Sequence, residues 1–229
     1  MLFIPAQITA EEKKMNQQVV LLHGLARSKG SLGKMEKRLQ DCGYNTCNIS
    51  YPSTKYSIDK LVFDYIIPDI EKCIKNSDKT VNFVTHSMGG IIVRCLAKRK
   101  LNFNIGRVVM LSPPNKGSEV VDKLGDMWLF NLMNGPAGKE LGTGENSIPN
   151  ILGPASFEVG IITGDKSINW ILSTMISGKN DGKVSVERAR LEGMADFIVI
   201  PATHPFIMKN ETAIEQTLFF LKHGKFKHD

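Results

Sequence analysis

The sequence predicts an α/β domain with a small, mostly parallel sheet of about six strands that helices flank. Short apolar runs of strand type alternate along the chain with longer segments of helical periodicity, which is the pattern of βαβ units. The chain has 229 residues, 42% of them hydrophobic, and no linker-like, repetitive or low-complexity stretch. We therefore expect a single domain over residues 1–229 with one substantial core.

The first half of the chain starts this alternation. Residues 19–22 form a continuous apolar run, which is typical of a strand buried on both faces of a parallel sheet. A helix is predicted over residues 31–42 and a short strand over 46–51. Residues 59–75 carry an apolar stripe at helical spacing, but Pro68 within them is expected to kink or split this helix.

The second half of the chain continues the alternation to its end. Apolar runs bounded by turn residues predict strands, and apolar stripes at helical spacing predict helices. The strands are predicted at 81–84, 107–111, 159–164 and 197–200, and the helices at 91–96 and 212–221.

The most informative motif, T-H-S-M-G-G at residues 85–90, lies between a predicted strand and a predicted helix. A serine at such a sharp turn is strained, and its hydroxyl is lifted out of the sheet toward a substrate carbonyl. The turn requires small residues two positions before and after the serine. Gly89 meets this need better than Thr85, where the usual pattern has glycine. Ser87 is therefore the candidate nucleophile.

A second motif, H-G-L at residues 23–25, follows the first predicted strand. Acyl transfer needs two N–H donors for the oxyanion, one after the nucleophile and one from the loop after an early strand. These donors are predicted to be the backbone amides of Leu25 and Met88. The Leu25 side chain is also expected to contribute to a pocket wall. We interpret His23 as a structural, hydrogen-bonded residue.

Five histidines are available as the base that activates the serine. His86 must point away from its neighbour Ser87, so we interpret it either as a structural residue or as one that supports the reacting residues from behind. His223 and His228 belong to a basic C-terminal end that we expect to be exposed. His204 follows the last predicted strand, so its loop opens at the edge of the sheet where parallel sheets bind ligands. His204 is the candidate base.

Two aspartates compete to be the acid that orients this histidine. Asp165 directly follows the strand predicted at 159–164, as a catalytic acid can. Asp181 lies in N-D-G-K-V at 180–184, a polar loop whose Asp-Gly pair also has a plain explanation as a turn. The residues alone leave both alternatives open.

In order and spacing these motifs resemble the α/β-hydrolase superfamily, and within it bacterial lipases and eukaryotic lipid deacylases. Those proteins share an H-G loop, an H-S-M-G-G or H-S-Q-G-G elbow and an N-D-G-x-V acid motif. Residues 108–118 and 202–206 resemble two further family segments, T-P-H-x-G-S and the histidine loop. The resemblance covers most of the chain and favours Asp181 over Asp165 as the acid.

The resemblance implies an enzyme, a serine hydrolase of the lipase or carboxylesterase type. Ser87 would attack an ester carbonyl with His204 as base and Asp181 behind it, and water would then release the acid. The same triad could serve a thioesterase or an acyltransferase, because cap shape and water access select the acceptor. A third alternative is a catalytically silent binding protein, against which the presence of all three residues argues.

Between residues 115 and 158 the apolar residues lose the regular spacing that marks buried helices and strands. This is the place where hydrolases insert a cap. Residues 120–133 are apolar enough for a lid helix over an acyl pocket or for a core helix, and both remain open. Trp128 and Phe130 are predicted to line the pocket. Residues 135–154 are rich in Gly, Pro, Ser and Asn and are predicted to be loop.

Neither a cofactor nor a metal is expected. Several similar lipases bind calcium through an aspartate two residues after the histidine, and here that residue is Phe206. The four cysteines have no paired metal spacing, and all are predicted to be reduced. Cys73 and Cys95 are predicted to be small buried hydrophobes, whereas Cys42 and Cys47 are close enough in sequence to suggest a disulfide.

The net charge of +6 comes with basic stretches at 98–100 and 222–227. We expect an ester or lipid as partner, at most weak contact with an anionic membrane surface, and no nucleic acid. No apolar run reaches the roughly 18 residues of a membrane span. The first residues lack the basic region of a secretory signal, so we expect a cytoplasmic protein, with export of a processed chain as the alternative.

Overall fold

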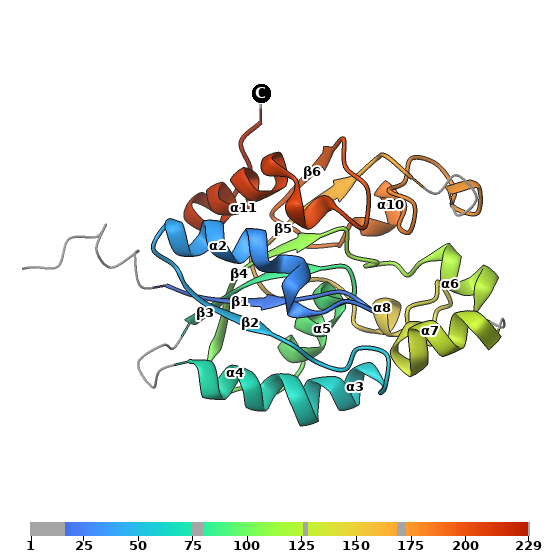
Figure 1. Ribbon diagram of the computed structural model, residues 1–229, viewed down its shortest axis with the longest axis horizontal. Helices are drawn as coiled ribbons and strands as arrows, with labels where there is room; N and C mark the ends of the chain where they lie inside the picture. The colour runs from blue at the N-terminus through green and yellow to red at the C-terminus, as the bar shows by residue number, and fades with distance from the viewer. Residues whose placement is uncertain (1–16, 75–79, 126–127, 169–172, 229) are drawn as a thin grey trace, which may run out of the picture.

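The computed structural model describes residues 17–74, 80–125, 128–168 and 173–228, with only the backbone described at 128–133. Six parallel strands form one open sheet in the order β2-β1-β3-β4-β5-β6, so the predicted small parallel sheet is confirmed (Figure 1). The strands are β1 (Gln18–Leu22), β2 (Asn45–Ile49), β3 (Thr80–His86), β4 (Asn104–Leu111), β5 (Val159–Gly164) and β6 (Asp196–Ile200).

Helices cover both faces of this sheet (Figure 1). Side chains alternate between faces along a strand, so Val19 and Leu21 belong to one core cluster and Val20 and Leu22 to the other. The first cluster packs against α2 (Gly33–Asp41) and α11 (Glu211–His223). The second packs against α3 (Ile58–Leu61), η2 (Val62–Ile66), α4 (Ile67–Cys73) and α5 (Met88–Ala97). Shorter elements complete these layers: η1 (Lys29–Leu32), α10 (Val186–Ala189) and η3 (Ile207–Lys209).

Pro68 splits the helical segment after β2, as predicted. The segment starts as α3, widens into the π-helical turn η2, and returns to α-helix in α4 with Pro68 in its first turn. Because the residues before it are helical, Pro68 removes one backbone hydrogen bond and its ring crowds a preceding carbonyl, and the wider π-helical turn η2 lies directly before it.

The segment at 115–158 contains α6 (Glu119–Leu124), α7 (Trp128–Lys139) and α8 (Ile148–Ile151). The loop predicted for 135–154 is therefore wrong in part, because it includes the end of α7 and all of α8. Gly135 bends α7 at a φ of 64°, and an added Cβ there would clash with the Thr54 carbonyl. Pro136 then starts the remaining helical turn, which explains why a stretch rich in Gly and Pro can still be helical.

One buried arginine connects α5 to both ends of this segment. The Arg94 guanidinium donates to the carbonyl oxygens of Asn115 at 3.0 Å, Pro149 at 2.7 Å and Gly153 at 2.8 Å. Burial lowers the pKa of Arg94 to about 10, so the group keeps its charge at neutral pH. Within the described residues, carbonyl dipoles and no carboxylate stabilise this charge.

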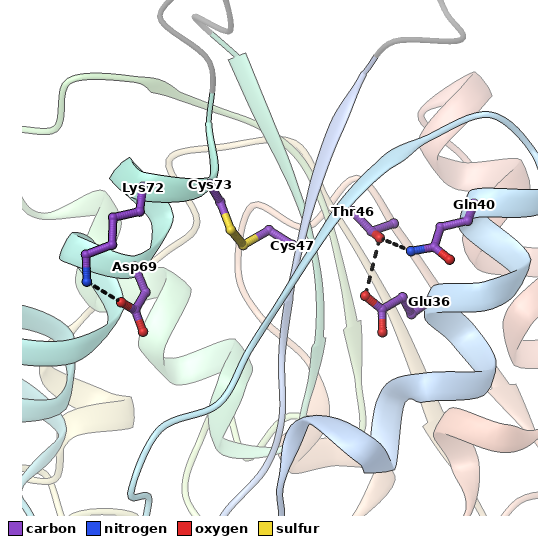
Figure 2. The surroundings of a disulfide bond; sticks show 7 residues. All are labelled: Glu36, Gln40, Thr46, Cys47, Asp69, Lys72 and Cys73. Atoms are coloured by element: carbon purple, nitrogen blue, oxygen red, sulfur yellow. Dashed lines mark hydrogen bonds and ion pairs between the residues drawn. A yellow bond between two sulfur atoms is a disulfide. The ribbon is translucent and has the colours of Figure 1, made fainter.

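The prediction of four reduced cysteines is wrong for Cys47 and Cys73, which form a disulfide (Figure 2). Cys47 lies on β2 and Cys73 ends α4, so the bond joins the sheet to a helix that packs on it. Their Cα atoms are 6.1 Å apart, within the usual range. Cys42, which is closer to Cys47 in sequence, is free and exposed, and Cys95 is free and buried as predicted.

The chain reverses direction across the sheet between β1 and β3. After β1 it adds β2 on one side, and it then adds β3 and the later strands on the other side. The loops after β1 and β3 therefore diverge at the carboxyl edge, where open α/β sheets bind ligands. Within the described ranges no helix is both long and apolar enough to cross a bilayer.

Candidate active site

Ser87 occupies a strained turn between β3 and α5. Its backbone has a φ of 53° and a ψ of −121°, a region that non-glycine residues rarely adopt. An added Cβ at Gly89 would clash with the Leu22 carbonyl oxygen, which explains the glycine two positions after the serine. Thr85 is tolerated two positions before it because its side chain is buried and bonded to the Val109 carbonyl at 3.5 Å.

Ser87 and His204 lie close together although 117 positions separate them in the sequence. The Ser87 Oγ lies 3.1 Å from His204 Nε2, and His204 Nδ1 lies 2.8 Å from Asp181 Oδ2. A carboxylate can only accept, so Nδ1–H donates to Asp181 and the neutral ring presents Nε2 as acceptor for the serine hydroxyl. His204 is only 4% exposed and Asp181 only 1%, so this chain of hydrogen bonds is shielded from water.

The Asp181 carboxylate stays ionised although it is buried. Burial opposes its charge, but the adjacent His204 and hydrogen bonds outweigh burial and lower the pKa of Asp181. Its Oδ1 accepts from the amides of Lys183 at 3.0 Å and Val184 at 2.9 Å. The hydroxyl of the buried Ser112 also lowers this pKa, although its geometry falls short of a hydrogen bond.

The structure places Asp181, and not Asp165, against His204. Asp165 follows β5 as predicted, but its carboxylate lies 3.9 Å from the ammonium of Lys166. Its amide donates to the Ile200 carbonyl at 3.3 Å, which holds the loop against β6. Asp181 is therefore the better candidate acid on geometry.

The loop after β1 meets the turn at Ser87. Gly24 packs so closely that an added Cβ would lie 3.1 Å from the Ser87 Cβ, and Met88 opens α5. Ala26 has a φ of 53°, and its amide donates to Ser53 Oγ at 3.1 Å. The amides of Leu25 and Met88, predicted as oxyanion donors, thus lie on two loops that converge, and their role stays a prediction.

His23 is hydrogen-bonded and buried, as its structural interpretation requires. Its Nδ1 donates to the Gly24 carbonyl at 2.8 Å, and its Nε2 accepts from the Tyr51 amide at 3.3 Å. The Tyr51 ring stacks on His23 with 4.0 Å between centroids, and the Tyr51 hydroxyl donates to the His23 carbonyl. Burial lowers the pKa of His23, so the ring is neutral and fixes the loop that carries Leu25.

His86 contacts the histidine loop, which the sequence reasoning missed. Its Nε2 donates to the His204 carbonyl at 3.0 Å, and the two rings are 4.9 Å apart. Burial and the nearby His204 lower the pKa of His86 well below the ordinary value. A neutral His86 therefore positions the His204 backbone, and only its place beside Ser87 could have suggested this.

A cavity of about 260 Å³ contains Ser87 and His204. Its apolar wall comes from Leu25, Leu141, Val184 and three residues of α6: Val120, Val121 and Leu124. Leu25 thus lines the pocket as expected. The three α6 residues belong to the stretch 120–133, for which a lid helix over an acyl pocket and a core helix were the two alternatives. The predicted wall residues Trp128 and Phe130 belong to α7, and their side chains lie outside the described part of the structure.

Among the described residues no group of three or more His, Cys, Asp or Glu side chains could hold a metal ion. The pair of His204 and Asp181 is already used in hydrogen bonds, and the position two residues after His204 holds Phe206, which is 53% exposed. The arrangement can activate a serine hydroxyl through a neutral histidine.

Known structures share this fold at low sequence identity. The mature form of lipase BlEst2 from Bacillus licheniformis is 19% identical, with 90% of this chain and 91% of that chain covered and a TM-score of 0.70. The metagenomic carboxyl esterase MGS0156 is 18% identical, with 90% of this chain and 68% of that chain covered and a TM-score of 0.66. Phospholipase PlaB from Legionella pneumophila is 17% identical, with 90% of this chain and 59% of that chain covered and a TM-score of 0.63. This chain therefore spans less than two thirds of the phospholipase.

Among curated protein sequences none matches this chain significantly. A family model does match, over residues 18–150, which is more than half of the 229 residues and includes the turn at Ser87. The predicted resemblance to the α/β-hydrolase superfamily is confirmed by this match, and the structural neighbours share the fold. The chain belongs to the α/β-hydrolase fold family.

Proposed function

We propose that this protein is a serine hydrolase that cleaves carboxylic esters, a lipase or carboxylesterase. The observation that carries the proposal is the buried chain of hydrogen bonds from Ser87 through His204 to Asp181. Structural neighbours whose names are lipase, carboxyl esterase and phospholipase support the same class of substrate.

In the first step the Ser87 Oγ attacks the acyl carbonyl carbon while His204 Nε2 takes the hydroxyl proton. Asp181 keeps the other ring proton on Nδ1 and stabilises the imidazolium that forms. The oxyanion is stabilised by the amides of Leu25 and Met88, and the positive end of α5 adds to this stabilisation. His204 then protonates the departing alcohol oxygen.

In the second step water attacks the acyl-enzyme. His204 takes one proton from the water, the hydroxide adds to the acyl carbon, and the bond to Ser87 breaks. The acid leaves and the serine regains its proton. The apolar wall formed by Leu25, Leu141 and α6 would hold the acyl chain during both steps.

A fluorophosphonate probe and a series of p-nitrophenyl esters of graded acyl length test this proposal. The wild type should be labelled and should hydrolyse the esters, whereas Ser87→Ala should lose the label and about 10⁶-fold in kcat. Ser156→Ala, at an exposed serine remote from the cavity, is the matched control and should behave as wild type. Labelling of Ser87→Ala would contradict the proposal. Acyl-CoA thioesters are assayed beside the esters, and faster hydrolysis of the thioesters would favour the thioesterase alternative.

A further inference from the structure

Two cationic side chains line the cavity that contains Ser87 and His204. Arg27 follows the Leu25 loop, and Lys183 follows Asp181 in the acid loop. Among the residues that the structure describes, no carboxylate lines this cavity and neither cation forms an ion pair. The charge of Asp181 raises the pKa of Lys183, but this carboxylate is already bound by His204 and by two backbone amides.

Arg27 and Lys183 line the same cavity, and their positive charges repel each other there. Although Lys183 is an exposed residue, the surrounding protein removes part of its hydration, and this loss and the charge of Arg27 lower the pKa of Lys183. Both cations also oppose protonation of His86, behind His204. Like charges raise the free energy of a folded protein unless an anion binds between them, so this pair favours an anionic ligand.

A second cavity, of about 460 Å³, adjoins the first one through Ala26 and Arg27. Its lining is more polar and includes Ser28, Ser31 and a further cation, Lys209, again with no carboxylate. The cavity that Ser87 lines thus combines an apolar wall, formed largely by α6, with the cations Arg27 and Lys183, and the polar second cavity adjoins it at Arg27. Such a combination suits a substrate with one apolar part and one anionic part.

We propose that the substrate is an ester with an apolar acyl chain and an anionic group, phosphate or carboxylate, on its alcohol side. This inference rests on the proposed function. The acyl chain occupies the apolar wall, and Arg27 and Lys183 bind the anion, for which the planar guanidinium offers paired donors. Hydrolysis adds the water hydroxyl to the acyl carbon and a proton to the alcohol oxygen, and the anionic group leaves unchanged on the alcohol.

Three soluble esters with the same octanoyl chain provide the test: those of glycerol, of glycerol 3-phosphate and of glycerophosphocholine. All are used as monomers. The wild type should prefer the glycerol 3-phosphate ester by about tenfold or more in kcat/KM, because hydrogen bonds between the cations and a fully charged phosphate are stronger than those to a neutral hydroxyl. High salt should reduce this preference.

Arg27→Gln and Lys183→Gln should each lower the preference several-fold, and the double variant should abolish it. Lys37→Gln, at an exposed lysine on α2, is the charge-matched control and should keep it. Thermal unfolding of each variant identifies any loss due to misfolding, and Arg27→Lys, which keeps the charge, should retain part of the preference.

The outcomes separate this inference from the proposed function. Equal rates for the three esters, with Ser87 still labelled by the probe, would overturn the inference and leave the hydrolase intact. A preference that appears only when the substrate is presented in anionic vesicles would assign the cations to a membrane surface and would also overturn it. Hydrolysis of none of the esters would contradict both.

Discussion

At the scale of single residues, the charge of Asp181 decides how the site can work. The carboxylate is almost completely buried, and each of its oxygens has a donor: His204 on one, and the amides of Lys183 and Val184 on the other. This arrangement fixes the proton of His204 on Nδ1. A change that moves this proton should therefore impair catalysis without removing any reacting group.

Asp181→Asn should lower kcat by about 10⁴-fold, as replacement of a triad aspartate does elsewhere. The new amide can donate to Nδ1, which moves the ring proton to Nε2, where it blocks acceptance from Ser87. Steady-state kinetics with p-nitrophenyl butyrate measure this effect. Asp165→Asn is the matched control and should change kcat less than about threefold; a larger loss there than at Asp181 would reverse the assignment.

The sequence predicted Ser87 and His204 because a strained turn and a strand end have local signatures. The residues alone left the choice between Asp165 and Asp181 open, since both follow turn or strand signals, and only the family resemblance favoured Asp181. Which of them reaches His204 depends on how the acid loop folds, and here Asn180 pairs with Ser185 across it. The bond from His86 to the His204 carbonyl joins residues 118 positions apart, and no local pattern indicates it.

At the scale of elements, the disulfide ties the second strand to the helix that ends at Cys73. It closes a loop over a sequence separation of 26 residues, on the face of the sheet away from α2 and α11. Such a covalent bond reduces the conformational freedom of the unfolded chain.

Reduction of Cys47–Cys73 should lower the free energy of unfolding by about 2–4 kcal/mol. Urea unfolding with and without a reductant measures the difference, and Cys47→Ala/Cys73→Ala should be insensitive to the reductant. Cys42→Ser, which removes an exposed free thiol, should keep the full sensitivity. Titration of the denatured, unreduced protein should give two free thiols, and four would contradict the bond.

The helices and strands were largely predictable, because the spacing of apolar residues and the residues that interrupt a helix are local features of the sequence. The buried β1, the split at Pro68 and the end of α11 all have such signals. The helices at 115–158 were harder to predict, since Gly135 and Pro136 normally indicate loop. Cysteine pairing was missed because it depends on how α4 lies over β2, which proximity in sequence does not reveal.

At the scale of the whole molecule, two buried neutral histidines make the stability of the fold depend on pH. Burial lowers the pKa of both His23 and His86 below the ordinary value of 6.5. Below that pH the unfolded chain binds protons that the folded chain does not bind, so the unfolded state is favoured. Their stabilising contribution is thus complete above about pH 7 and decreases as the pH falls.

The free energy of unfolding should fall between pH 7 and pH 5, by at most about 1.4 kcal/mol per pH unit for each histidine. Urea unfolding at half-unit steps measures the slope, and the lower limit keeps most carboxylates ionised. His86→Gln should flatten the slope, whereas His223→Gln, at an exposed residue of α11, should not. A slope that His86→Gln leaves unchanged would contradict this origin.

The contacts of Arg94 limit how the segment above the pocket can move. A single guanidinium holds Asn115 at its start and Pro149 and Gly153 near its end, so these points are anchored to the helix that begins beside Ser87. The anchored residues all lie outside α6 and α7, so this guanidinium ties the two ends of the segment, and not these two helices, to the element that carries the candidate nucleophile.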